Sequence, residues 1–179
     1  MLLHTILRPF VLVMTLVSLT LAASFDHTQT FTDLRSLRSR IDSINDCLET
    51  FDGGILKSVS CGKALYDLLG ASASMRSQYE SSGAISSDQL PEFFENYHAM
   101  QSSARKALKS AASKSSQFDS AGFTVFAQSI IESFSSQRAA LEKLTTERVP
   151  TVNHSMIAGP SDSLDAEFRS ALHGMSGGV

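Results

Sequence analysis

The chain has 179 residues, of which 15 are basic and 18 are acidic, and its formal net charge is −3. This length suits one domain that buries about two thirds of the surface exposed by its unfolded chain. Nucleic acid is excluded as a partner class, because phosphate recognition needs a dense basic patch and the basic residues here are interspersed with serine and acidic residues.

The first 23 residues have the layout of a secretory signal peptide. A single cation, Arg8, precedes an apolar and hydroxyl run over residues 10–21, and small residues follow. A membrane-spanning helix needs about 20 apolar residues, which disfavours the alternative of a retained signal anchor. We therefore expect cleavage after Ala23, a short lead over residues 24–30, and a secreted product that is extracellular or held in the cell wall. No second apolar run of spanning length follows, so no transmembrane anchor is expected.

Helical periodicity predicts an αα-hairpin at the start of the mature chain. The inward stripe of the first helix is Leu34, Leu37, Ile41, Ile44, Leu48 and Phe51. The sequence DGG at 52–54 ends this helix, because glycine adopts the left-handed conformation that closes a helix C-terminus. A second helix is predicted from Ile55 to Tyr79. Its inward positions are Val59, Leu65, Leu68, Leu69, Met75 and Tyr79.

The two cysteines are predicted to form a disulfide within this hairpin. Cys47 lies six residues before Gly53 and Cys61 lies eight after it, so the two residues sit at similar heights on antiparallel neighbours. An oxidising secretory route favours the bridge, and closing a loop of this size stabilises the fold by about 3 kcal/mol. Two cysteines alone cannot complete a zinc site, and no metal site is expected.

Two longer helices follow. Pro91 fits the first turn of a third helix, which continues through residues 92–116. Its broad apolar side contains Phe93, Phe94, Tyr97, Met100, Ala104, Leu108 and Ala111. The junction QFDSAG then breaks the pattern, and a fourth helix is predicted from Thr124 to Arg148. Its inward positions are Phe126, Ile130, Phe134, Leu141 and Leu144, with Phe123, Ala127 and Ile131 widening the stripe.

The last region is predicted to hold a fifth helix that is short or broken, because a GPSD turn interrupts it. Residues 173–179 are expected to form a flexible tail. The tripeptide NHS makes Asn153 a candidate for N-glycosylation. Strand signals are scarce, so the fold class is all-α, with a single bundle of four to five amphipathic helices over residues 31–172.

No motif for catalysis is present. His98 is the only histidine on a confidently periodic helix, and no GxSxG elbow accompanies it, so we interpret it as a polar helix residue. The chain also lacks HExxH, a DxDxDG calcium loop and GxxxxGK[ST]. We therefore expect neither an enzyme nor a cofactor.

Four short motifs carry a resemblance to a known family. They are FDGG after the first helix, LKSAASKSSQFDSAG before the fourth, the helix FTVFAQSIIESFSSQRAALEKL, and TTERVP at its end. Together they resemble the fungal hydrophobic surface-binding protein A family, which includes cell wall galactomannoproteins. The resemblance covers about residues 31–172 and implies a secreted helical bundle that binds hydrophobic surfaces, or fatty acids held between its helices. The cysteine pair and the interrupted fifth helix depart from the family pattern.

Two hypotheses for function remain. In the first, the protein sequesters a fatty acid or other apolar ligand between its helices or binds a hydrophobic surface, and a mostly apolar site suits the lack of catalytic groups. The candidate wall residues are Leu65, Leu69, Phe94, Tyr97, Met100, Phe126, Ile130 and Phe134. In the second, the protein is a structural cell wall mannoprotein or a host-directed effector with a dry core, and cell wall glycans are a further class of partner. Plain core packing is the alternative role for each wall candidate.

Overall fold

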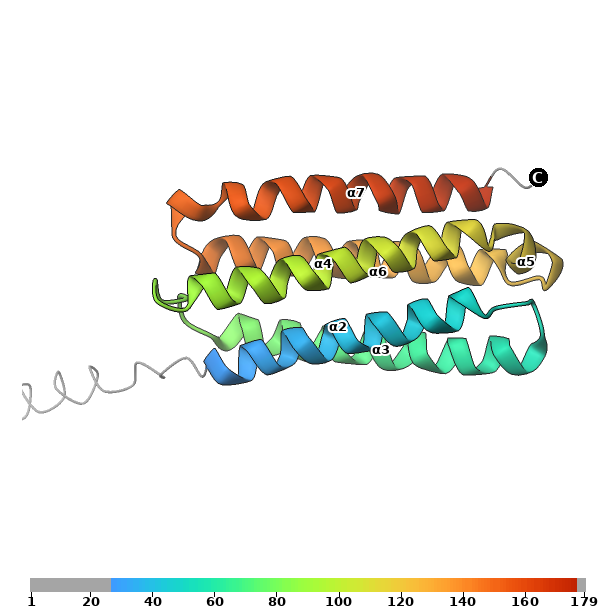
Figure 1. The fold of residues 1–179 in the computed structure, drawn as a ribbon, viewed down its shortest axis with the longest axis horizontal. Helices are drawn as coiled ribbons and strands as arrows, with labels where there is room; N and C mark the ends of the chain where they lie inside the picture. The colour runs from blue at the N-terminus through green and yellow to red at the C-terminus, as the bar shows by residue number, and fades with distance from the viewer. Residues whose placement is uncertain (1–26, 177–179) are drawn as a thin grey trace, which may run out of the picture.

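A computed structural model describes residues 27–176 (Figure 1). The expected signal peptide, residues 24–26 of the lead and residues 177–179 of the tail lie outside this range. The helices, with one 3-10 turn, are α2 (His27–Glu49), α3 (Ile55–Ser81), α4 (Leu90–Ser113), α5 (Ser115–Ser120), α6 (Thr124–Arg148), η1 (Thr151–Asn153) and α7 (Ser155–Ser176). The described range contains no strand, and the all-α prediction is confirmed.

The five long helices form a closed ring. α2 packs on α3 and α4, α4 packs on α7, α7 packs on α6, and α6 returns to α3. Figure 1 shows that α2, α4 and α7 run in one direction while α3 and α6 run in the other. Each helix therefore has two neighbours in the ring and turns one face toward a shared central axis.

The apolar stripes fill the interior of the ring, apart from single positions on α3 and α6. The α2 stripe from Leu34 to Leu48 is buried at every expected position. Val59, which was expected inward on α3, is 67% exposed. The buried residues of this helix follow steps of three and four from Cys61, and Val59 lies on the opposite side of the helix from them. The prediction for Val59 was therefore wrong, because the buried stripe of α3 lies on the other side of the helix.

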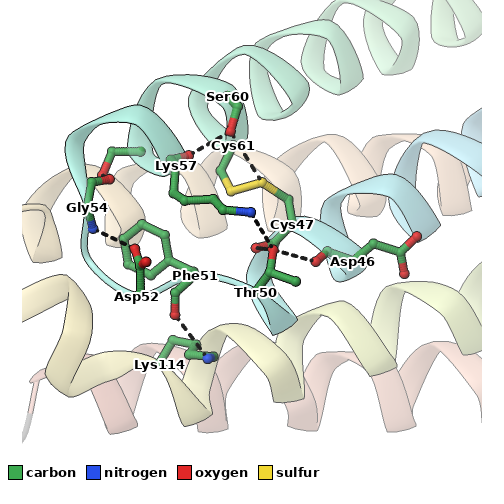
Figure 2. Close-up of a disulfide and its surroundings, with 11 residues drawn as sticks. Asp46, Cys47, Thr50, Phe51, Asp52, Gly54, Lys57, Ser60, Cys61 and Lys114 are labelled. Atoms are coloured by element: carbon green, nitrogen blue, oxygen red, sulfur yellow. Dashed lines mark hydrogen bonds between the residues drawn. A yellow bond between two sulfur atoms is a disulfide. The ribbon is translucent and has the colours of Figure 1, made fainter.

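The turn between α2 and α3 is built as the sequence predicts. Gly53 has a φ of 84°, a conformation that residues with a Cβ rarely adopt. The Asp52 Oδ1 atom accepts a hydrogen bond of 2.8 Å from the Gly54 amide. Figure 2 shows the disulfide between Cys47 and Cys61 beside this turn, with their Cα atoms 5.7 Å apart. The predicted pairing is confirmed, and the bridge joins the two arms of the hairpin.

Two contacts fix the turn to the rest of the bundle. The Lys114 ammonium donates to the carbonyl oxygen of Phe51 at 3.0 Å (Figure 2) and to that of Glu49 at 3.1 Å. The Phe51 ring also packs on Phe118 in α5, with ring centroids 4.9 Å apart. The QFDSAG junction thus forms a short helix and a turn at Gly122, whose φ is 72°, and it covers the disulfide end of the bundle.

The last helix is continuous, which corrects the expectation of a short or broken one. α7 has 22 residues and contains Pro160 inside its first two turns. A proline there removes the amide that would donate to the carbonyl of Met156, four residues earlier. The His98 Nε2 atom on α4 replaces that donor and bonds the Met156 carbonyl oxygen at 2.8 Å. A contact between helices therefore compensates for the proline, which local sequence patterns do not reveal.

Both ends of the bundle extend beyond their expected bounds. α2 begins at His27, within the expected lead, and α7 ends at Ser176. Met175 is buried, so the first residues of the expected flexible tail belong to the packed last helix. Asn153 is half-buried in η1 between α6 and α7, and its glycosylation stays a prediction.

Candidate apolar ligand cavity

A cavity of about 140 Å³ lies on the central axis of the ring. All five long helices line it, through residues such as Ile44, Leu65, Met100, Phe134 and Phe168. Most of its wall is apolar, because the inward stripes of the helices supply aliphatic and aromatic side chains. The cavity lies where the inward faces of the five helices meet.

A second cavity of about 80 Å³ continues the first toward the disulfide end. The residues that line both cavities are Leu48, Leu65, Ala111, Ile130 and Ile131. Phe51, Phe118 and Phe123 line the far end of the smaller one. Along α4, the lining residues run from Tyr97 to Ala111, a rise of about 21 Å at 1.5 Å per residue. The two spaces therefore follow one elongated apolar path.

The eight candidate wall residues divide into three groups. The five that line the central cavity are Leu65, Tyr97, Met100, Ile130 and Phe134. Phe126 lines the smaller cavity but is 50% exposed, which corrects its expected inward position. Phe94 is buried between Phe93 and His98, away from both cavities, and Leu69 is half-buried and lines neither. Ala127 and Ile131, rather than Phe126, are the buried residues near the start of α6.

The central cavity has a polar end near the middle of the bundle. Tyr97 and Gln101 stand one turn apart on α4, and both face Ser161 of α7. The Tyr97 hydroxyl lies 3.4 Å from the Ser161 Oγ atom, and the Gln101 Nε2 atom donates to the same oxygen at 3.5 Å. Burial raises the pKa of the Tyr97 phenol above its usual value, although the hydrogen bond with Ser161 lowers it, and the Glu142 carboxylate raises it further.

An ion-pair cluster completes this polar end. Arg138 of α6 pairs with Glu142 on the same helix, and its Nη2 atom contacts Asp165 Oδ1 of α7 at 2.5 Å. Gln137 lines the cavity beside Arg138. These residues were missed at the sequence level, yet a signal was present. Arg138 occupies the inward position between Phe134 and Leu141, at steps of four and three.

The described residues contain no group of three or more histidine, cysteine, aspartate or glutamate side chains placed to hold a metal ion. None of the described helices is both long and apolar enough to cross a membrane.

Together, the ring and its interior place the chain among all-α proteins built around an apolar cavity. The model of a family described as hydrophobic surface binding protein A matches residues 28–147, more than half of the chain. The chain belongs to this family, as the four sequence motifs predicted. Among curated proteins, none matches it in sequence.

Solved structures share the fold at low sequence identity. The crystal structure of Afmp4p in complex with palmitic acid matches with a TM-score of 0.80 at 19% identity, over 84% of this chain and 99% of that one. Ligand binding domain 2 of the Penicillium marneffei MP1 protein, in complex with arachidonic acids, gives 0.76 at 15% identity, over 87% and 98%. Ligand binding domain 1 of the same protein, complexed with arachidonic acids, gives 0.73 at 12% identity, over 80% and 94%.

Proposed function

We propose that this protein is a secreted, non-enzymatic carrier that holds the alkyl chain of a fatty acid or similar lipid along the axis of its helical ring. The observation that carries the proposal is the elongated apolar path from Tyr97 to the disulfide end. Its length of about 21 Å suits an extended long-chain acyl group. The palmitic and arachidonic acids in the similarly folded proteins support the same ligand class.

The size of the cavity adds a condition to this proposal. Sites for drug-sized ligands enclose about 300–1,000 Å³, whereas the central cavity encloses about 140 Å³. A long acyl chain therefore needs the helices or the side chains around it to move apart. Met100, near the Tyr97 end of the path, is suited to such adjustment because its unbranched thioether side chain adapts to irregular space.

Binding of radiolabelled palmitate by delipidated protein tests the proposal. We expect saturable binding of about one chain per molecule, and native mass spectrometry of the secreted protein reports bound lipid directly. The matched variants are Ala104→Leu, which narrows the cavity, and Ala166→Leu, which makes the same change on the exposed side of α7. Absence of saturable binding by the wild-type protein would refute the carrier function. Secretion is checked in the same sample by a mature N-terminus after Ala23.

Adsorption to hydrophobic surfaces is a second candidate function, which a separate observation favours. Leu56 and Val59 of α3 and Val125 and Phe126 of α6 are large apolar residues that are 50–88% exposed. They lie near the starts of these helices, which Figure 1 places at the same end of the bundle. Retention on a phenyl resin that survives Val125→Ser/Phe126→Ser substitution would contradict this assignment.

A further inference from the structure

The polar end of the central cavity carries an excess of negative charge. Arg138 and Glu142 are the charged side chains among its described lining residues, and Asp165 binds Arg138 from α7. The Arg138 side chain is 16% exposed, so water screens this cluster only partly. One guanidinium set against two carboxylates leaves a net charge of −1. A ligand group placed beside the cluster meets that charge.

Three lining side chains also leave polar atoms without partners. Gln101 Oε1, Gln137 Oε1 and Arg138 Nε are buried, and none has a hydrogen-bond partner anywhere in the described range. Buried polar groups are normally paired, because leaving them unpaired is costly. The Arg138 Nε–H can only donate, whereas each amide end can present either its oxygen or its N–H after a half turn. Together they suit a ligand group that both donates and accepts.

The charge discriminates between the head groups that such a chain can carry. An ionised carboxylate only accepts hydrogen bonds, and it would be repelled by the excess negative charge in a partly desolvated site. A hydroxyl or a protonated carboxyl donates and accepts without adding charge. The side-chain amides of Gln101 and Gln137 can turn to suit either head group. The net charge of the ion-pair cluster stays negative whichever way the amides turn, so the charge decides which head group is preferred.

We infer that the polar end, through Gln101, Gln137 and Arg138, binds the uncharged hydroxyl-bearing head of a long-chain lipid in preference to an ionised carboxylate. The ligand class is a fatty alcohol or a fatty acid in its protonated form. The alkyl chain then extends from Tyr97 toward the phenylalanines of the disulfide end. This inference rests on the proposed carrier function and specifies its ligand.

The test compares 1-dodecanol with sodium dodecanoate at pH 8, each displacing the neutral dye Nile red from delipidated protein. The measured quantity is the ratio of the two dissociation constants, compared between the wild type and the Glu142→Gln/Asp165→Asn double variant. That comparison cancels the greater general hydrophobicity of the alcohol. We expect the preference for the alcohol to fall at least about tenfold in the double variant, because Arg138 then carries an unbalanced positive charge. Glu132→Gln removes an exposed carboxylate from the same helix and leaves the ratio unchanged.

The outcomes separate this inference from the carrier function. Tight binding of both ligands with the same ratio in wild type and double variant overturns the head-group preference and leaves the carrier function intact. Failure of the wild type to bind either ligand overturns the carrier function itself. Far-UV circular dichroism checks that the double variant folds. If it does not, the single variant Glu142→Gln keeps the pair between Arg138 and Asp165, and its ratio is expected to shift in the same direction by a smaller factor.

Discussion

Substitution of Ala104 by leucine distinguishes a real cavity from a dry core by the sign of its effect. Ala104 lines the central cavity between the inward positions Gln101 and Leu108 of α4. Leucine adds three carbon atoms, and burying each contributes about 0.8 kcal/mol, or about 2.4 kcal/mol in all. Ordering the longer side chain costs about 0.5–1 kcal/mol. The net expectation is an increase of about 1.5 kcal/mol in the free energy of unfolding.

The assay pairs urea denaturation with palmitate binding on the same variant. In a chain of this size, such a stabilisation raises the melting temperature by about 3–6 °C. The affinity for palmitate is expected to fall at least tenfold, or about 1.4 kcal/mol, because the leucine side chain occupies part of the alkyl path. The exposed control Ala166→Leu is expected to change stability by no more than about 0.5 kcal/mol and to bind normally. If Ala104→Leu instead destabilises the protein by about 1–3 kcal/mol and leaves binding unchanged, the interior is closely packed and the reasoning fails.

Three further predictions concern stability. Replacing Cys47 and Cys61 by serine is expected to cost about 3 kcal/mol in urea denaturation; a smaller loss than 1 kcal/mol would mean that the hairpin does not depend on the bridge. Burial raises the pKa of Tyr79, whose hydroxyl has no partner in the described range. Because the folded-state pKa is the higher one, the neutral phenol is compatible with folding below the unfolded pKa of about 10, and stability is lost as the pH rises above that value. Tyr79→Phe should therefore be near neutral at pH 7 and reduce alkaline unfolding, and an unchanged alkaline transition would contradict this. His98→Ala should cost about 1 kcal/mol and speed amide exchange at the start of α7, whereas His98→Gln, which keeps a donor, should restore protection.

The sequence predicted most of the fold because the helices depend on local patterns. The bounds of α6 follow from its periodicity and from the turn at Gly122, and the start of α3 follows from the glycine turn before it. The cysteine pairing followed from the spacing on either side of Gly53. Each of these features is decided by residues that lie close together in the chain.

The errors arose where a contact between distant segments decides the structure. Pro160 suggested a broken helix, but the donor that compensates for it, His98, lies on α4. The wall positions were chosen by size, so Phe94 and Phe126 were included although one belongs to the core and the other reaches solvent. Periodicity defines which face of a helix is apolar, but not which part of that face borders the space where five helices meet.

The disulfide has a further consequence for the entry of a ligand. It makes α2 and α3 a single mechanical unit, and the chain joins this unit to α4 only through residues 82–89, at the opposite end of the bundle. At the disulfide end, beside the smaller cavity, this unit is held to the rest of the bundle by contacts between packed helices rather than by the chain itself. These contacts include the bonds from Lys114 to the turn and the packing of Phe51 on Phe118. For the proposed carrier, we expect weakening of these contacts to change the rate at which lipid enters and leaves, while the residues that line the axis stay the same.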